Sequence, residues 1–247
     1  ILFRWMHDTG NNTAIYILDR PNPSGRQVEG VHNSGIPQKH GLTLAEIANM
    51  FYTDIGATFP LHIISAEATM AGRLLMPWTI PADEEFASLF SANFHCGQYL
   101  WNGTNISHGE GTERPYEFFG APFINPSLQT DSVYNKGVFL RHAGFIPSSG
   151  PYAGLKCFGF QLIANPAEQY NSYLHAIRLI RWIKDSTPEF QFNSKMEALI
   201  GDDMVMRYLN GAQEWDITKE YIKTEEQKWV RKAKKYLLYD MQPFRVK

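Results

Sequence analysis

The sequence predicts an α/β fold, in which a domain with a mainly parallel sheet is followed by a second α/β domain. Short apolar runs rich in β-branched and aromatic residues alternate with segments of helical spacing, which is typical of strands joined by short crossovers. The pattern changes near Asn125, after which longer strand-like segments and long helices follow. We therefore divide the 247 residues into domains at 1–125 and 126–247.

Composition and motifs argue against several classes of function. Hydrophobic residues make up 44% of the chain, charged residues 19%, and the net charge is −2. This balance gives no electrostatic reason to expect nucleic acid or an anionic membrane as the main partner. No apolar stretch approaches the ~20 residues of a membrane span. The motifs GxxxxGKS/T, GxSxG, HExxH and GxGxxG after a strand are absent, which disfavours nucleotide binding and the commonest hydrolases.

The cysteines and the first residues of the chain support two further predictions. Cys96 and Cys157 stand in no spacing typical of a metal site, so we expect no zinc and favour two buried free thiols over a disulfide. The first twelve residues, ILFRWMHDTGNN, show no basic and apolar leader and read as an amphipathic helix closed by Gly10. The chain reads as one that begins inside an element, as a fragment would.

The segment TAIYILDRPNPSG, residues 13–25, predicts a buried strand followed by a loop at its carboxyl end. Ligands gather at such ends in open α/β sheets, so Asp19, Arg20 and Asn22 are candidate site residues. The alternative is that Asp19 and Asn22 only organise the turn by hydrogen bonding to the backbone.

A helix is predicted to begin near Thr43. Thr43 and Glu46 have the spacing of a capping box, and apolar residues follow at helical intervals. His40 precedes this positive amino end, where an anion can bind. The alternative is that His40 packs against the helix or caps it.

Strands are also expected at 59–65 (FPLHIIS) and 95–101 (HCGQYLW), with a loop and a short helix at 81–91 between them. The second strand would deliver a polar loop, LWNGTNISHGEGTERPYEFFGAPF at 100–123, to the carboxyl edge of the sheet. Its glycines allow tight turns, and its polar side chains are rich in hydrogen-bonding groups.

The second half is expected to hold strands at 137–147 and 154–165 and helices at 167–185 and 218–239. The last helix carries a basic face, which we interpret as solvated rather than as a nucleic-acid patch. Its residues are Lys228, Arg231, Lys232, Lys234 and Lys235.

Four stretches in this order resemble one known family. They are LDRPNPSG with VEG, GIPQKHGLTLAEIANMF, GTNISHGEGTERPYEFFGAPFI and the closing KKYLLY. Through them the chain is identified as a member of the DUF1343 family, the NamZ-type exo-β-N-acetylmuramidases, over nearly its whole length. The resemblance implies part of a Rossmann-like, mainly parallel domain, then a smaller α/β domain, with the active site in the cleft between them. No dinucleotide is implied.

The resemblance implies a glycoside hydrolase that releases N-acetylmuramic acid from the non-reducing ends of peptidoglycan fragments, in the periplasm or the extracellular space. Sugar hydrolysis by carboxyl groups needs neither a metal nor another cofactor.

The chain departs from the family pattern in three places. Nothing matches the family's PEHG-like segment, whose glutamate is assigned a catalytic role. Asn102 stands where the family usually has the glutamate of Glu-Gly-Thr, and residues 108–112 read His-Gly-Glu-Gly-Thr instead of Glu-Gly-Arg-Gly-Thr. The alternative to an active hydrolase is therefore a catalytically silent homologue, or a fragment, that binds amino sugars or cell-wall fragments.

Cleavage of a glycosidic bond normally uses two carboxyl groups, about 5–5.5 Å apart for retention and roughly 6.5–9.5 Å apart for inversion. We assign catalysis to Glu117, which lies among aromatic residues, and to Glu110. The alternative for Glu117 is a buried acid bound to backbone N–H groups or to Arg114. The other acids available near the expected cleft are Asp19, Glu29 and Glu113.

The lactyl carboxylate of muramic acid requires a positive or N–H-rich wall. The groups expected to supply it are Arg20, His40, Arg114 and the helix start at Thr43. The residues expected to bind hydroxyl and acetamido groups are Asn22, Asn102, Thr104, Asn105 and Thr112. We expect the corner of Asp19 and His40 and the loop around Thr104 and Thr112 to form one wall of a single saccharide cleft.

Overall fold

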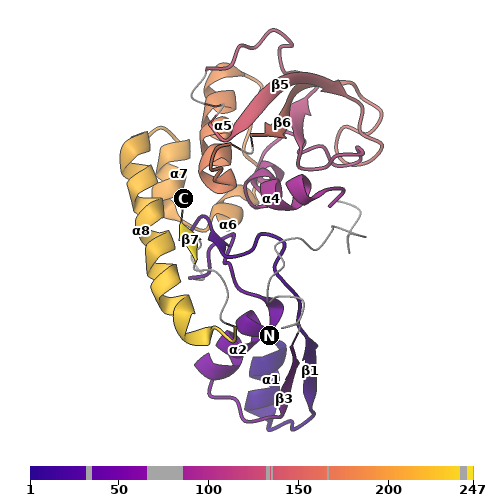
Figure 1. Ribbon diagram of the computed structural model, residues 1–247. Helices are drawn as coiled ribbons and strands as arrows, with labels where there is room; N and C mark the ends of the chain where they lie inside the picture. The colour runs from indigo at the N-terminus through magenta and orange to yellow at the C-terminus, as the bar shows by residue number, and fades with distance from the viewer. Residues whose placement is uncertain are drawn as a thin grey trace.

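The computed structural model describes residues 1–31, 35–65, 86–131, 134, 136–165, 167–239 and 244–246. It has two parts, and the long helix α8 (Trp215–Ala233) runs along one side of both of them (Figure 1). The predicted α/β class is confirmed. The domain boundary placed between residues 125 and 126 stays a prediction.

The amino-terminal part contains a parallel pair of strands with a helix packed on one face. Its elements are α1 (Leu2–Thr9), β1 (Ile15–Leu18), β2 (Gln27–Val28), α2 (Leu44–Asp54) and β3 (Leu61–Ile64). β1 pairs in parallel with β3, and β2 pairs in parallel with β7 (Arg245–Val246). The predicted end of the first helix at Gly10 is confirmed by its left-handed conformation, with a φ of +66°. Both hydrogen bonds of the predicted capping box at Thr43 are also present.

The strand predicted at residues 13–25 is confirmed, but the expectation that it is buried is wrong. Residues along β1 alternate between the two faces of the sheet. Tyr16 is 65% exposed and Leu18 is 73% exposed, because α2 packs on β1 from one side only and these two side chains point to the other.

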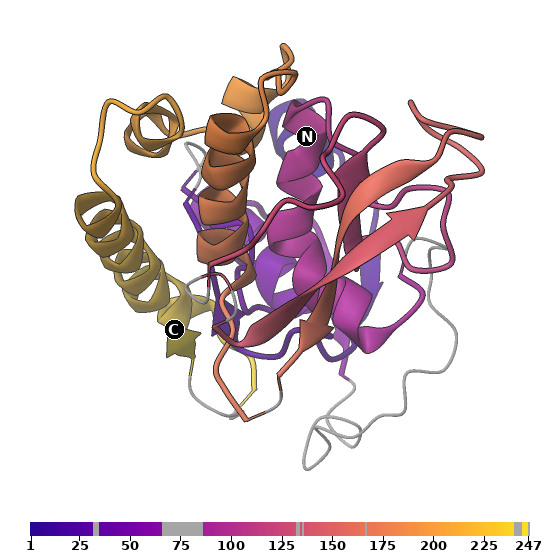
Figure 2. The same ribbon diagram turned by 90° about the horizontal axis from the view of Figure 1, so that it is seen from above.

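The carboxyl-terminal part is built on an antiparallel sheet with the strand order β4-β6-β5. The strands are β4 (Phe118–Ala121), β5 (Val138–Phe145) and β6 (Cys157–Ala164). The helices are α4 (Leu89–Gln98), η1 (Tyr99–Gly103), α5 (Ser172–Ser186), α6 (Met196–Ile200), α7 (Asp203–Leu209), α8 and η3 (Lys234–Tyr236). Helices α4 and α5 pack against each other beside the sheet (Figure 2). The strands and helices predicted for the second half of the chain are therefore confirmed.

The strand expected at 95–101 is wrong, because these residues end α4 and form η1. The hydroxyl of Ser88 caps α4 by accepting a 3.0 Å hydrogen bond from the Ser91 N–H. Gly97 brings α4 close to α5, where a Cβ atom would lie 2.0 Å from the Ser172 carbonyl oxygen. A short apolar run does not by itself distinguish a buried strand from a buried helix. Of the loop and helix expected at 81–91, residues 81–85 lie outside the described part.

Apolar side chains gather in two clusters. The larger fills the space between α4, α5 and the antiparallel sheet. The smaller joins α2 to the end of α8 and consists of Val28, Leu42, Met50, Trp229, Ala233 and Tyr236. Cys96 and Cys157 are buried free thiols, as predicted. Within the described residues, no helix combines the length and the apolar character needed to cross a bilayer.

Candidate functional site

A hollow of about 240 Å³ lies where β1 ends and α2 begins. Arg20, Asn22 and His40 line it, and the rest of its wall is formed by prolines and aliphatic side chains. Three residues predicted to bind substrate therefore surround one hollow at the carboxyl end of the parallel strands. We take this hollow as the candidate site.

His40 offers this hollow a hydrogen-bond donor rather than a positive charge. Its Nδ1 accepts a 3.1 Å hydrogen bond from the Leu42 N–H, and its carbonyl oxygen accepts one of 2.8 Å from Trp229 Nε1. Burial lowers the pKa of His40, although the nearby Glu46 carboxylate acts in the opposite direction. The ring is therefore neutral at pH 7 and carries its hydrogen on Nε2. The positive charge of this wall comes from the exposed Arg20.

Both carboxylate oxygens of Asp19 accept hydrogen bonds from groups at the start of α2. One carboxylate oxygen accepts a 2.7 Å hydrogen bond from the Thr43 hydroxyl, and the other accepts one of 3.0 Å from the Ala45 N–H. Asp19 is thus itself the anion at this positive helix end. Since the carboxylate of Asp19 fills that place, the expected capture of a substrate carboxylate by the helix start at Thr43 is not supported.

Asn22 has a similar organising task. Its Nδ2 donates to the Leu42 carbonyl at 2.9 Å, and its Oδ1 accepts from the Ser24 N–H at 2.9 Å. The amide therefore fixes the loop after β1 against the segment before α2 and shapes the wall of the hollow. These contacts match the turn-organising alternative for Asp19 and Asn22.

Glu29 is also engaged at a helix start. It accepts hydrogen bonds from the Ser172 N–H (2.8 Å) and hydroxyl (2.6 Å), at the first residue of α5. Its other oxygen lies 2.9 Å from Lys39 Nζ. This buried ion pair and the helix start leave Glu29 no free oxygen for chemistry.

Glu117 joins the polar loop to the start of α4. One oxygen accepts from the hydroxyls of Ser88 (2.6 Å) and Ser91 (3.1 Å), and the other lies 3.2 Å from Arg114. The side chain is buried. This arrangement resembles the structural alternative for Glu117, with serine hydroxyls in place of backbone N–H groups. The catalytic assignment of Glu117 stays a prediction.

Most polar side chains of the loop hold the loop itself. Thr104 donates to the Trp101 carbonyl and accepts from the Ile106 N–H. Thr112 likewise donates to the Gly109 carbonyl and accepts from the Arg114 N–H.

The two asparagines of the loop face the segment that follows α5. Asn105 bridges the Glu189 carbonyl and the Gln191 N–H through its side chain. The carbonyl of Asn102 accepts from Asn193. The side-chain amide of Asn105 is therefore bound to a neighbouring chain segment, whereas Asn102 contacts that segment through its backbone.

Glu110 differs from the other acids of the site. Across the described ranges, its carboxylate makes no hydrogen bond or ion pair, and it rests against Gly150, where a Cβ atom would be 2.8 Å from Oε2. None of the loop residues lines the hollow of Arg20 and His40. The single wall expected for Asp19, His40, Thr104 and Thr112 is therefore not seen in the part of the chain that the structure describes.

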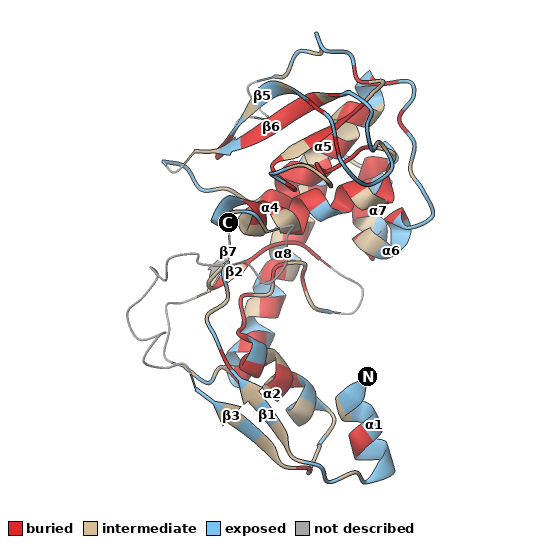
Figure 3. Cartoon of the chain, turned by 90° about the vertical axis from the view of Figure 1, so that its right-hand side faces the viewer, coloured by how far each residue is buried: buried red, intermediate tan, exposed pale blue. Residues whose placement is uncertain are grey.

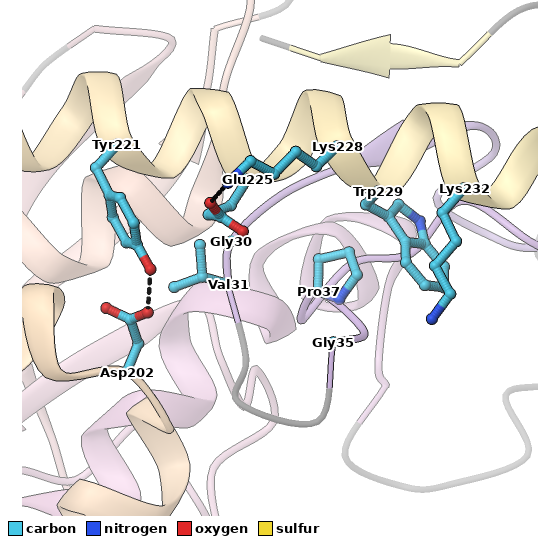
Figure 4. Close-up of a pocket in the computed structure, with 10 residues that line it drawn as sticks. All are labelled: Gly30, Val31, Gly35, Pro37, Asp202, Tyr221, Glu225, Lys228, Trp229 and Lys232. Atoms are coloured by element: carbon cyan, nitrogen blue, oxygen red, sulfur yellow. Dashed lines mark hydrogen bonds and ion pairs between the residues drawn. The ribbon is translucent and has the colours of Figure 1, made fainter.

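A second hollow, of about 390 Å³, lies between α8 and four residues of the chain before α2, namely Gly30, Val31, Gly35 and Pro37 (Figure 4). On its α8 side Lys228 contacts Glu225 at 2.6 Å, and the Tyr221 hydroxyl donates to Asp202 at 2.6 Å. Lys228 and Glu225 therefore pair with each other, and Asp202 is bound by a neutral tyrosine.

The sequence analysis missed Glu226, which lies beside this second hollow. One oxygen accepts from the Gly30 N–H at 2.9 Å and from Asn171 Nδ2 at 3.3 Å, while the other has no hydrogen-bond partner among the described residues. Burial, the main cause, raises the pKa of Glu226 to about 8. The sequence did contain a sign that Glu226 is buried. This acid lies on the apolar stripe of its helix, four residues after Ile222 and three before Trp229.

Two family models match the chain. The one described as "Exo-beta-N-acetylmuramidase NamZ, N-terminal" matches residues 2–81, and "Exo-beta-N-acetylmuramidase NamZ, C-terminal" matches residues 93–239. The chain is 30% identical over 251 residues to the peptidoglycan beta-N-acetylmuramidase NamZ of Bacillus subtilis (strain 168). That alignment covers 93% of this chain but 60% of the relative, so the chain spans less than two thirds of the relative's length.

Two solved structures of DUF1343 family proteins from Bacteroides fragilis NCTC 9343 share the fold. One superposes with a TM-score of 0.74 at 22% identity, covering 98% of this chain and 70% of the other. The second gives a TM-score of 0.72 at 20% identity, covering 96% and 69%.

Proposed function

Because the chain belongs to the NamZ family of exo-β-N-acetylmuramidases, we propose that it is a glycosidase that releases N-acetylmuramic acid from the non-reducing ends of peptidoglycan fragments. We place this activity in the periplasm or outside the cell. The observation that carries the proposal is the meeting of Arg20, Asn22 and His40 around one hollow at the carboxyl end of β1. These residues come from two separate loops, and both loops belong to the stretches that resemble the family.

The chemistry of this hollow suits an acidic sugar. The Arg20 guanidinium, which is charged at any physiological pH, would pair with the lactyl carboxylate of muramic acid. The neutral His40 ring would donate its Nε2 hydrogen to a hydroxyl or acetamido oxygen. The aliphatic side chains of Leu42, Leu44 and Ile47 would pack against the apolar face of the sugar ring.

For the catalytic acids, we propose Glu110 ahead of Glu117. The Glu110 carboxylate is not committed to any described partner, whereas both oxygens of Glu117 are held by hydrogen bonds. Neither residue lines the candidate hollow. This separation favours, as a second candidate function, a protein that binds an amino sugar without cleaving it.

Hydrolysis of para-nitrophenyl N-acetylmuramic acid tests the first function. We expect release of the chromophore by the wild-type protein and a value of kcat/KM lower by about 10- to 100-fold in Arg20→Ala, the range expected when a charged hydrogen bond is lost. The matched control is Arg231→Ala, which removes an exposed arginine from α8 and should leave kcat/KM unchanged. Equal losses of kcat/KM in the two variants would show that this hollow is not part of the active site.

Calorimetric titration with N-acetylmuramic acid separates the two functions. Binding that depends on Arg20, without turnover at any pH from mildly acidic to neutral, would identify the non-catalytic protein. Absence of both binding and turnover would contradict both functions.

A further inference from the structure

The histidine of the candidate hollow is held by a residue of the carboxyl-terminal part. The His40 carbonyl oxygen accepts a 2.8 Å hydrogen bond from Nε1 of Trp229, which lies 189 residues further along the chain on α8. Figure 4 shows the Trp229 ring projecting from α8 toward the chain before α2. This ring is 4% exposed and packs with Leu42 and Met50 in the smaller apolar cluster. Packing therefore fixes the direction in which the indole N–H points.

Each carbonyl oxygen in residues 40–42 accepts a hydrogen bond from a separate side chain. Arg26 Nη1 donates to the Gly41 carbonyl at 3.0 Å, and Asn22 Nδ2 donates to that of the following residue at 2.9 Å. Both donors lie between β1 and β2, in the same part of the molecule as the hollow. The carbonyl of His40 takes its bond from α8 instead. The backbone of this turn is thus held from both parts of the molecule.

The bond from Trp229 matters because a glycine follows His40. Gly41 has a φ of +69°, a left-handed conformation that glycine adopts at little steric cost. Glycine also permits other values of φ, so the peptide unit between His40 and Gly41 can rotate more easily than one between two larger residues. The carbonyl oxygen turns with this peptide unit, and its hydrogen bond to Trp229 opposes the rotation.

The orientation of the same peptide unit determines where the imidazole ring points. His40 Nδ1 accepts a 3.1 Å hydrogen bond from the Leu42 N–H, and this two-residue turn passes through the left-handed Gly41. Because Nδ1 is an acceptor, the neutral ring carries its hydrogen on Nε2, the donor that the hollow offers to a sugar. If the peptide unit rotated, Nδ1 would lose its partner and either nitrogen could carry the hydrogen.

We propose that Trp229 is a positioning residue of the candidate site, which acts on the substrate through His40. Trp229 does not line the hollow of Arg20 and His40, so it does not touch the substrate itself. The inference rests on the proposed function, because that function assigns His40 to the binding of N-acetylmuramic acid. The hollow of the amino-terminal part is then completed by a donor from α8.

Trp229 also packs in the core, and the two roles have different kinetic consequences. A loss of packing reduces the amount of folded protein, which lowers the apparent kcat and leaves KM unchanged. A loss of the bond to His40 weakens substrate binding in protein that is still folded, which raises KM.

Two replacements remove the indole N–H to different extents of ring loss. Trp229→Phe keeps one aromatic ring, and 3-benzothienylalanine at position 229 keeps both fused rings with sulfur in place of the N–H. With para-nitrophenyl N-acetylmuramic acid as substrate, we expect KM to rise about 3- to 10-fold in both proteins, as for one neutral hydrogen bond. The value of kcat for the benzothienyl protein should stay within about twofold of wild type.

The matched control is Asn49→Ala. Asn49 Nδ2 donates to the Tyr236 carbonyl at 3.2 Å, a bond that also joins α2 to the end of the helical segment beyond α8 but does not involve His40. This variant should leave KM unchanged.

Nuclear magnetic resonance of the histidine rings tests the positioning of His40 without substrate. In the wild-type protein the neutral His40 ring should carry its hydrogen on Nε2, and His40→Asn assigns the signals of this ring. In the benzothienyl protein the hydrogen should be distributed over Nδ1 and Nε2. A wild-type protein without turnover would contradict the proposed function, and the ring spectrum would still show whether Trp229 positions His40.

An unchanged His40 ring spectrum in the benzothienyl protein overturns the proposal, whatever the activity. An unchanged KM in an active benzothienyl protein also overturns it. So does an equal rise of KM in Asn49→Ala, since general loosening between the two parts would then explain the effect.

Discussion

The two parts of the molecule are held together in different ways. In the carboxyl-terminal part a continuous apolar cluster fills the space between α4, α5 and the sheet, whereas the amino-terminal part has a small cluster and a half-exposed strand pair (Figure 3). Buried charges compensate for this in the smaller part. Glu46 accepts from both terminal nitrogens of Arg26, from the Thr43 N–H and from the Leu238 N–H. Where little apolar area is buried, charged hydrogen bonds fix the geometry.

Removing Glu46 should give the largest effect. Glu46→Ala leaves the buried Arg26 without its partner, so the free energy of unfolding should fall by about 3–5 kcal/mol. Chemical denaturation monitored by circular dichroism measures the change. The double variant Arg26→Met with Glu46→Leu, which leaves no unpaired charge, should recover much of the loss. A loss below about 1 kcal/mol in Glu46→Ala would show that the ion pair is not what holds this part together.

Glu226 provides a second test, at the place where α8 meets α5. The folded protein binds this proton more tightly than the unfolded chain does, because burial raises the pKa of Glu226 to about 8. The stability that comes from protonated Glu226 is therefore fully present below about pH 4.5, and it is lost as the pH rises through 8.

Relative to Glu226→Gln, the wild-type protein should lose on the order of 3 kcal/mol of stability between pH 5 and pH 8.5. Denaturation curves of the two proteins across this range measure the difference. If the free energy of unfolding changed with pH in the same way in both proteins, Glu226 would not have the raised pKa. The control is Glu225→Gln at the neighbouring, partly exposed position. In this variant stability should change with pH as it does in the wild-type protein.

The smallest effect is expected at Glu117, whose cationic partner Arg114 has a side chain that is 60% exposed. Glu117→Gln keeps an oxygen for the serine hydroxyls and loses an exposed ion pair, so stability should fall by about 1 kcal/mol. Turnover of the muramic acid glycoside should stay within tenfold of wild type. A loss of a thousandfold with an intact melting curve would restore Glu117 to catalysis.

The sequence predicted those features whose partners are close along the chain. The capping box of Thr43 and Glu46 spans three residues, and the helix end at Gly10 depends on one backbone conformation. Asp19 could not be assigned in the same way, because the Thr43 hydroxyl that it binds is 24 residues away. Glu29 meets Ser172 across 143 residues, and Glu226 meets Gly30 across 196.

This difference in range explains why acids were hard to assign. Asp19, Glu29 and Glu117 lie at the starts of α2, α5 and α4, and each was a reasonable catalytic candidate from its position in the sequence. The same residue type serves a helix start and a glycosidase, and composition does not distinguish the two. The hollow of Arg20 and His40 was predictable, because the carboxyl end of a parallel strand is a general binding position.

Helix α8 fixes the spacing between distant parts of the surface. Trp229 is bonded to the His40 carbonyl, and Glu226, which accepts from the Gly30 N–H, precedes it by three residues, or about 4.5 Å along the helix axis. An unbroken α-helix has a fixed rise per residue, so this distance does not vary. The separation along α8 between its contacts to His40 and to Gly30 is therefore set by the helix itself.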